Sequence, residues 1–360
     1  MEKIISIRDR IRGSLVGGAA GDALGYSVEF FREPTIFQAY GPKGIQSYEL
    51  GPNGKALISD DTQMALFTAN ALLRASQGQL DALSRYALDA YRAWHITQTV
   101  YYSPEFRIPD DERGHASDLL QDIPELYARR APGLTCMSAI QRRELQLKEG
   151  VSYTSFMQNK INYSKGCGGI MRVAPLGLAV HDWDQEQLAV EGAELAAITH
   201  SHPLGYVSAA CLTLILNAIV YPQKKQTLQQ IIEDARDATA DLFRDESHIQ
   251  EHTAIITKAI ELSQNSQPDL DNIHNLGEGW VAEETLAIAI YCSLKYQKDF
   301  SAALTASVNH NGDSDSTGAV TGNILGAWMG YKAINAKWKT NLELHDLILN
   351  MADRLHDNFQ

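Results

Sequence analysis

Two short acidic segments lie far apart in the sequence, each beside a run that is typical of a helix. Residues 59–62 read Ser-Asp-Asp-Thr and precede an apolar helix that we expect to begin near Gln63. Residues 311–317 read Asn-Gly-Asp-Ser-Asp-Ser-Thr and precede a second expected helix. Either segment alone is explained as a helix cap, because these residue types are preferred there and carboxylates favour the positive helix end. One carboxylate suffices for a cap, so the second in each segment points to a cation.

If the two segments face each other, they predict a site for hard divalent cations. Such ions take oxygen ligands from carboxylates, hydroxyls, carbonyls and water. Four carboxylates in the segments and a fifth near the N-terminus would nearly balance two divalent ions, which together carry about four positive charges. These five are Asp60, Asp61, Asp313, Asp315 and Glu29. Packed together without metal, they would raise one another's pKa values.

Two series of glycines spaced by four residues are the elements expected to position these carboxylates. Each glycine costs a helix about 1 kcal/mol relative to alanine, so a compensating gain is needed. Close backbone approach provides it, either for packing alone or to bring a site together. Asp22 and Glu29 lie beside the first series, and Asp313 and Asp315 beside the second, so we expect sequence-distant carboxylates to converge. The series are Gly13, Gly17, Gly21 and Gly25, and Gly318, Gly322, Gly326 and Gly330.

Apolar residues recur at spacings of three and four along most of the chain, and strand-like alternation is nearly absent. This pattern predicts an all-α fold of a dozen or more helices. No linker divides the chain, so we expect one domain over 1–360. The irregular stretch over about 97–115 is expected to be a surface loop, either passive or a lid. Beyond the helices near residues 65–73 and 83–90, further helices are expected over 116–129, 135–149, 185–200, 204–220, 227–243, 249–265, 280–296, 317–333 and 341–356.

Composition excludes several classes of protein. The 360 residues carry 31 Lys and Arg against 44 Asp and Glu, a net charge of −13, so binding to nucleic acid or anionic lipid is not expected. Four scattered cysteines and a charged N-terminus favour a reducing cytoplasm over export. The uncharged stretch 203–223 is long enough to span a membrane, but its polar residues favour a buried central helix.

Three motifs in this order resemble the ADP-ribosylglycohydrolase family, which includes ADP-ribosylarginine hydrolases and dinitrogenase-reductase-activating glycohydrolases. The first is GGAAGDALG at 17–25, followed by Glu29; the others are SDDT at 59–62 and GDSDS at 312–316. The resemblance spans nearly the whole chain. It implies a compact orthogonal bundle of α-helices around a binuclear metal centre that holds two divalent cations, Mg²⁺ or Mn²⁺.

By the same resemblance, each motif supplies part of the site. Glu29 is similar to a family glutamate near the scissile bond, and Asp60, Asp61 or Glu29 would accept a proton from the attacking water. The implied metal ligands are Ser59, Asp60 and Asp61 from the first segment, and Asp313, Asp315 and Ser316 from the second.

Two further stretches belong to the resemblance. Residues 166–175 read GCGGIMRVAP, and free backbone N–H groups of such a turn suit a diphosphate. Its expected substrate-binding residues are Gly166, Cys167, Gly168 and Gly169. His200 in the stretch THSHP is similar to a substrate-contacting histidine, although a single histidine beside an apolar helix is more often structural. Many relatives have Asn where this chain has Cys167 and Leu134, so the grip on phosphate, ribose or leaving group is open.

The implied activity is metal-dependent hydrolysis of the glycosidic bond between ADP-ribose and an acceptor, with ADP-ribosylated arginine on a protein favoured by resemblance. Another N- or O-linked protein or small-molecule conjugate is an alternative. A thiol hydrolase with Cys167 as nucleophile and His200 or His202 as base is a second. A non-catalytic protein that binds ADP-ribose or a partner on the same fold is a third.

Overall fold

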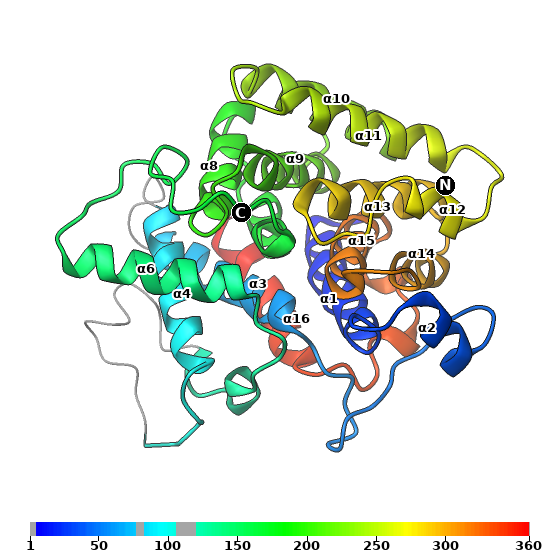
Figure 1. Ribbon diagram of the computed structural model, residues 1–360, viewed down its shortest axis with the longest axis horizontal. Coiled ribbons are helices and arrows are strands. Elements are labelled where there is room, and N and C mark those ends of the chain that lie inside the picture. The colour runs from blue at the N-terminus through cyan, green and yellow to red at the C-terminus, as the bar shows by residue number, and fades with distance from the viewer. Residues whose placement is uncertain (1–4, 77–82, 106–119, 360) are drawn as a thin grey trace.

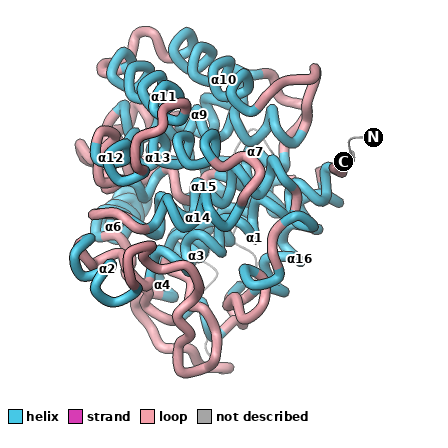
Figure 2. Tube along the Cα trace, turned by 90° about the vertical axis from the view of Figure 1, so that its right-hand side faces the viewer, coloured by secondary structure: helices cyan, strands magenta, loops and turns pink. Residues whose placement is uncertain are grey.

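The computed structural model describes residues 5–76, 83–105 and 120–359, and these ranges contain helices and no strands (Figure 2). The expected all-α class is therefore confirmed. The α-helices are α1 (Ile7–Tyr26), α2 (Glu33–Tyr40), α3 (Asp60–Ala75), α4 (Leu83–Thr97), α6 (Leu134–Lys148), α7 (Ala174–Ala179), α8 (Gln185–Ala197), α9 (Pro203–Val220), α10 (Leu228–Leu242), α11 (Ile249–Ser263), α12 (Asp269–His274), α13 (Ala282–Lys295), α14 (Phe300–Val308), α15 (Ser314–Met329) and α16 (His345–Asn358). Short 3-10 helices are η3 (Pro124–Tyr127), η4 (Cys167–Gly169), η5 (Tyr331–Ala333) and η6 (Ala336–Trp338).

Most expected helices are present within a few residues, but the helix expected over 116–129 is wrong from residue 120 onward. Only η3 forms there, beginning at Pro124, which has no backbone N–H to donate to a continuing helix. Residues 116–119 lie outside the described residues. The same holds for 106–115 of the expected loop, while 98–105 are irregular.

Helices α1 and α15 lie side by side at the centre of the molecule (Figure 1). They run antiparallel with glycine facing glycine, so close that a Cβ on an α1 glycine would overlap the carbonyl oxygen opposite. The facing pairs are Gly13–Gly326, Gly17–Gly322 and Gly21–Gly318, with Cβ-to-oxygen distances of 2.1, 2.4 and 1.9 Å. The predicted close backbone approach is confirmed. Its consequence is that the end of α1 adjoins the beginning of α15, where Gly25 faces Ser314.

Other helices surround this pair: α1 contacts α3, α7 and α16, and α15 contacts α13 and α14. Helix α9 is long and apolar enough to cross a membrane, with a mean hydropathy of 1.8, but 89% of it is buried inside the protein. It packs against α7, α8, α10 and α13. The expectation of a central core helix is confirmed.

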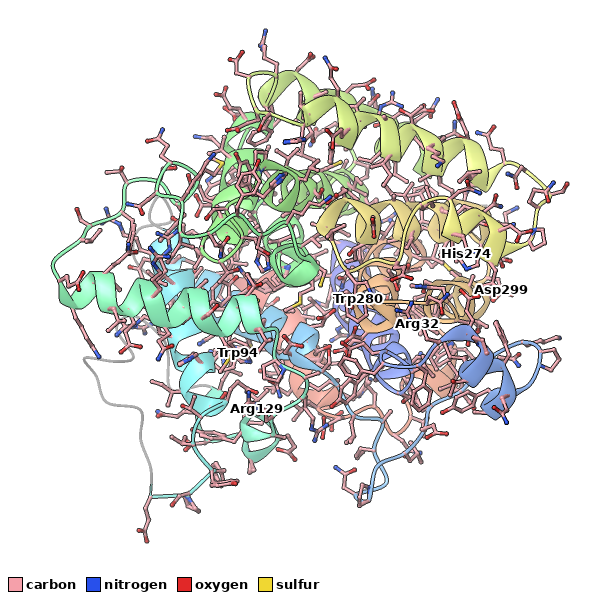
Figure 3. The ribbon with its side chains drawn as sticks, viewed as in Figure 1. Arg32, Trp94, Arg129, His274, Trp280 and Asp299 are labelled. Atoms are coloured by element: carbon pink, nitrogen blue, oxygen red, sulfur yellow. The ribbon has the colours of Figure 1, made fainter. Side chains whose placement is uncertain are left out.

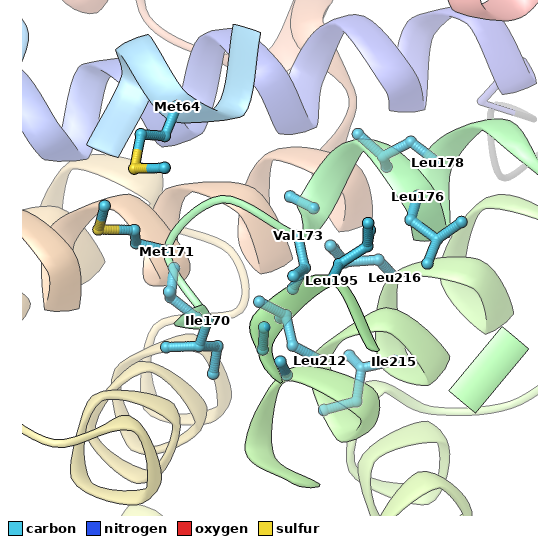
Figure 4. Close-up of a cluster of buried hydrophobic side chains, with 14 of the residues drawn as sticks. Met64, Ile170, Met171, Val173, Leu176, Leu178, Leu195, Leu212, Ile215 and Leu216 are labelled. Atoms are coloured by element: carbon cyan, nitrogen blue, oxygen red, sulfur yellow. The ribbon is translucent and has the colours of Figure 1, made fainter. Parts of the chain in front are cut away.

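The glycine-rich turn at 166–169 is continuous with the hydrophobic core. Directly after it, Ile170 and Val173 are fully buried and lie near Leu195 of α8 and Leu212 of α9 (Figure 4). Because these side chains anchor the segment, the turn has a fixed position relative to α8 and α9.

Candidate metal centre

The two acidic segments form the beginnings of α3 and α15. Ser59 is the N-cap of α3, and Asp60 and Asp61 occupy its first turn. Asp313 is the N-cap of α15, and Asp315 lies in its first turn. Both helices thus begin about three residues earlier than expected, because carboxylates are favourable in a first helical turn and do not delay its start.

The structure brings these carboxylates together with Glu29 from the turn after α1. Side-chain oxygens of Asp60, Asp61 and Asp315 lie within 4.8 Å of one another, and so do those of Glu29, Asp313 and Asp315. Asp315 belongs to both groups, so the five residues form one continuous cluster, which we call the acidic cluster. The predicted convergence is confirmed.

The acidic cluster is buried and has oxygen atoms left over. All five residues are at most 8% exposed. Among the residues that the structure describes, one carboxylate oxygen of Asp61 and one of Glu29 are buried without a hydrogen-bond partner. A buried carboxylate oxygen without a partner is costly unless a cation satisfies it. An all-oxygen set of this kind fits hard divalent cations, and two overlapping groups fit two of them.

The electrostatics of the acidic cluster agree with this interpretation. Burial, followed by the charges of Asp315 and Asp313, raises the pKa of Glu29 to about 10. Burial also raises the pKa of Asp60 and of Asp61 well above the usual range, with the charge of Asp315 adding to the effect. Bound divalent cations would lower these pKa values, because they stabilise the charged form of the carboxylates.

The hydroxyl residues of the two motifs lie beside the carboxylates. Ser59 is fully buried, and its hydroxyl accepts a hydrogen bond from the backbone N–H of Asp61 at 3.2 Å. Ser316 is 1% exposed, and its backbone N–H donates to Asp315 Oδ1 at 2.9 Å. Both residues therefore adjoin the acidic cluster.

Asp22 is a positioning residue. The sequence analysis noted it beside the first glycine series but did not predict it as part of the site. Its carboxylate is fully buried in α1 and accepts the backbone N–H of Ser59 at 3.0 and 3.1 Å. It also accepts the backbone N–H of Thr62 at 3.1 Å and the Thr62 hydroxyl. Asp22 thereby fixes the start of α3 against α1. The pair Gly21-Asp22 could have indicated this role, because the glycine allows close packing beside the aspartate.

The glycine-rich turn lies next to the cluster, but part of its N–H groups are already used. Gly166 N–H donates to Ser164 Oγ and Cys167 N–H to the carbonyl of Trp280. Within the described residues, this leaves the N–H groups of Gly168 and Gly169 for an anion. Substrate binding by Gly166, Cys167, Gly168 and Gly169 stays a prediction.

A fully buried arginine that the sequence analysis did not predict as part of the site holds the glycine-rich turn in place. Arg172 donates to the carbonyl of Gly168 at 2.5 Å and to Thr199 Oγ1 at 2.7 Å. Its guanidinium also lies 4.4 Å from the ring centroid of Tyr91. By holding the Gly168 carbonyl inward, Arg172 directs the N–H side of the turn the other way.

His200 lies beneath the turn. It is 2% exposed, and its Nδ1 is 2.8 Å from Thr199 Oγ1. A Cβ on Gly166 would be 3.2 Å from its Nε2. Burial, followed by the charge of Arg172, lowers the pKa of His200 to about 3, so its imidazole is neutral at physiological pH.

Cys167 is poorly suited to be a nucleophile. Its thiol donates to Asp313 Oδ2 at 2.6 Å. Burial, followed by the charges of Asp313 and Asp61, raises its pKa well above the usual range, whereas a nucleophilic cysteine needs a lowered one. The thiol-hydrolase alternative is disfavoured on these grounds.

Exposed aromatic residues lie on the segments that adjoin the acidic cluster. Phe30 follows Glu29 directly and is 70% exposed, and Trp280 is 40% exposed. Arg32 pairs with Glu278 at 2.9 Å, which links these two segments. Figure 3 shows Arg32 and Trp280 on the same face of the molecule. Planar groups of a substrate can stack on such side chains.

Comparison with known proteins places this geometry in a family. The family model described as ADP-ribosylglycohydrolase matches residues 4–360. The ADP-ribosyl-[dinitrogen reductase] glycohydrolase of Rhodospirillum rubrum is 26% identical, over 94% of this chain and 92% of that protein. The human ADP-ribosylhydrolase ARH3 is 25% identical, over 98% and 94%. The ADP-ribosylarginine hydrolase Tri1 of Serratia proteamaculans is 23% identical, over 96% and 79%.

The fold is also found among solved structures. A chain described as an ADP-ribosylglycohydrolase-related protein complex superposes with a TM-score of 0.64 at 23% identity, covering 99% of both chains. The compact helical bundle that the resemblance implied is therefore confirmed.

Proposed function

The chain belongs to the ADP-ribosylglycohydrolase family, and on this basis we propose that it is a metal-dependent hydrolase that releases ADP-ribose from an acceptor. The observation that carries the proposal is the acidic cluster, whose two carboxylate groups share Asp315 in a buried site. Its unpartnered oxygens and raised pKa values are those of a ligand set for cations.

We assign the metal ligands by motif and position. When bound, two Mg²⁺ or Mn²⁺ ions would bind ribose hydroxyls and lower the pKa of a water molecule, so that hydroxide is available at neutral pH. The ligands that we propose are Ser59, Asp60, Asp61, Asp313, Asp315 and Ser316.

The chain's own residues then have three tasks. Glu29, Asp60 or Asp61 accepts the proton of the attacking water while the glycosidic bond breaks with oxocarbenium-like character. The N–H groups of Gly168 and Gly169 bind the diphosphate, with Arg172 holding their turn in place. Burial of the cluster keeps bulk water from the reacting carbon, and this strengthens each electrostatic interaction.

For the acceptor we propose arginine. One relative supports this proposal through its name, the ADP-ribosylarginine hydrolase Tri1. The name of the dinitrogen reductase glycohydrolase supports an ADP-ribosylated protein as the substrate. ARH3 is similar to the chain to the same extent and its name specifies no acceptor, so other linkages belong in the test. The partner is accordingly an ADP-ribosylated protein or small molecule.

We also propose that the chain is a single domain and that the protein is cytoplasmic. Residues 1–360 act as one domain, because α1 and α15 from opposite ends of the chain make the site together. Free cysteines at 136, 167, 211 and 292 fit a reducing cytoplasm.

The test is incubation of the protein with arginine-, serine- and glutamate-linked ADP-ribose, with Mg²⁺ or Mn²⁺ and with EDTA. We expect release of ADP-ribose from the arginine conjugate and loss of that release in EDTA. No release from any linkage would contradict hydrolysis, and release that EDTA does not affect would contradict the metal centre. Release from another linkage alone would correct the acceptor.

A further inference from the structure

Position 167 places a sulfur atom against the carboxylates proposed to bind metal. Cys167 Sγ lies 2.6 Å from Asp313 Oδ2, and Asp313 belongs to the group with Glu29 and Asp315. The thiol stands on η4, and the core packing of Ile170 fixes that segment. A soft sulfur donor and a hard oxygen donor are therefore adjacent, close enough to bind the same ion.

Unpartnered oxygens point to a ligand at the same place. One carboxylate oxygen of Asp61 is buried without a hydrogen-bond partner in the described part of the chain, and the residue is only 3% exposed. Asp61 lies in the group that shares Asp315 with the group of Asp313, and Asp313 contacts the Cys167 thiol. Glu29, 8% exposed, has a second such oxygen in the group that contains Asp313. The thiol thus borders a buried, carboxylate-lined site in which two oxygens have no hydrogen-bond partner among the described residues.

We propose that Cys167 makes this centre a binding site for thiophilic divalent cations, so that Zn²⁺ or Cd²⁺ binds through Cys167 Sγ and the Asp313 carboxylate in place of Mg²⁺ or Mn²⁺. Sulfur ligands select soft cations over hard ones. The proposal rests on the metal centre proposed above, but it does not depend on hydrolysis.

Protons balance in this exchange. The thiol loses one proton when its sulfur becomes a ligand, and Asp313 Oδ2, which already accepts the thiol's hydrogen bond, is its first acceptor on the way to solvent. The thiolate adds one negative charge to the ligand set. This extra charge favours any divalent cation, while the sulfur favours the soft ones. The result is inhibition by trace Zn²⁺ or Cd²⁺, reversed by a chelator and excess Mg²⁺.

The experiment is a Cd²⁺ titration of the whole protein, followed by the ultraviolet charge-transfer absorption of a cadmium–thiolate bond. Wild type, Cys167→Ser and the control Cys211→Ala are compared; Cys211 is fully buried in α9 and has no part in the proposed site. We expect the band in wild type and in the control, and no band in Cys167→Ser. We also expect its Cd²⁺ affinity to fall on the order of ten- to a hundredfold, with a much smaller change for Mg²⁺.

A second measurement needs no variant. X-ray absorption at the cadmium edge of the wild-type complex should show a sulfur neighbour among the oxygen ligands. Absence of the band and of the sulfur neighbour in wild type would overturn the proposal, as would a band that persists in Cys167→Ser. Failure of hydrolysis with every ADP-ribose conjugate would refute the proposed function alone, because cadmium absorption is read without substrate.

Discussion

The Asp22 carboxylate of α1 accepts the backbone N–H of Ser59 at 3.0 Å, immediately before the paired aspartates of α3. The helix that packs against α15 therefore also sets the position of α3. Three segments distant in the sequence meet at the acidic cluster through this contact and the glycine crossing.

Asp22→Asn should weaken metal binding without contacting the metal. The amide provides one acceptor oxygen where the carboxylate provides two, and its NH₂ group faces the donors of Ser59 and Thr62. We expect cation affinity to fall on the order of ten- to a hundredfold, because second-shell partners orient the ligands. Calorimetric titration with Mn²⁺ measures this. Unchanged affinity in a folded variant would show that α3 holds its position without Asp22.

Asp315→Asn should remove most of the metal binding, because Asp315 is the carboxylate shared by both groups of the cluster. In wild type, we expect Mn²⁺ to raise the thermal midpoint, since a ligand that binds only the folded state stabilises it. The variant should lose this shift and the hydrolysis. The control is Asp346→Asn, whose side chain is fully exposed in the first turn of α16. Equal midpoint shifts in the two variants would exclude Asp315 from the site.

Gly21→Ala should destabilise the protein far more than an ordinary glycine-to-alanine change. The added Cβ would lie 1.9 Å from the carbonyl oxygen of Gly318, so α1 and α15 must separate. We expect a loss of about 3 kcal/mol or more in the free energy of unfolding. At the control position Gly133, a Cβ would meet its nearest atoms at 3.8 Å, and the change should stay within about 0.5 kcal/mol. Denaturant unfolding compares them; similar losses would refute the tight crossing.

Stability should fall on acidification because of His252. This side chain is fully buried in α11, and both ring nitrogens lack a hydrogen-bond partner within residues 5–76, 83–105 and 120–359. Burial lowers its pKa from 6.5 to about 4. Between these values the unfolded chain binds a proton that the folded chain does not. This proton uptake leaves the free energy of unfolding unchanged above pH 6.5. As the pH falls from there to about 4, it lowers the free energy of unfolding progressively, by about 3 kcal/mol in total.

His252→Leu tests this assignment, because leucine cannot take up the proton. The difference in unfolding free energy between variant and wild type should be constant above pH 7 and should change in favour of the variant as the pH falls toward 5. A difference that is independent of pH over this range would show that His252 is not responsible.

The sequence allowed the convergence of the two acidic segments to be predicted because its indications are local. Two carboxylates at each helix beginning exceed what a cap needs, and the glycine spacing indicates a tight crossing. The supporting residues could not be predicted in the same way. Arg172 and Asp22 act through partners that only tertiary packing provides, such as the Gly168 carbonyl and the Ser59 N–H.

Other details also depended on packing. The glycine-rich motif suggested free backbone N–H groups, but those of Gly166 and Cys167 donate to Ser164 Oγ and to the Trp280 carbonyl. Short helices such as α12 and α14 give too few turns for a periodic pattern. The helix expected over 116–129 is wrong from residue 120 onward because Pro124 outweighs the apolar spacing and begins a 3-10 helix there.

The crossing of α1 and α15 also constrains how the protein is made. Asn323 of α15 donates to the carbonyl of Ser14, 309 positions earlier in the chain. During synthesis, α1 leaves the ribosome long before α15 has been made. Until then, the glycine face of α1 can contact only other segments of the chain or a chaperone. A nascent chain that ends before α15 carries only part of the acidic cluster, so the proposed metal ions can bind with the full set of carboxylates only after α15 has been made.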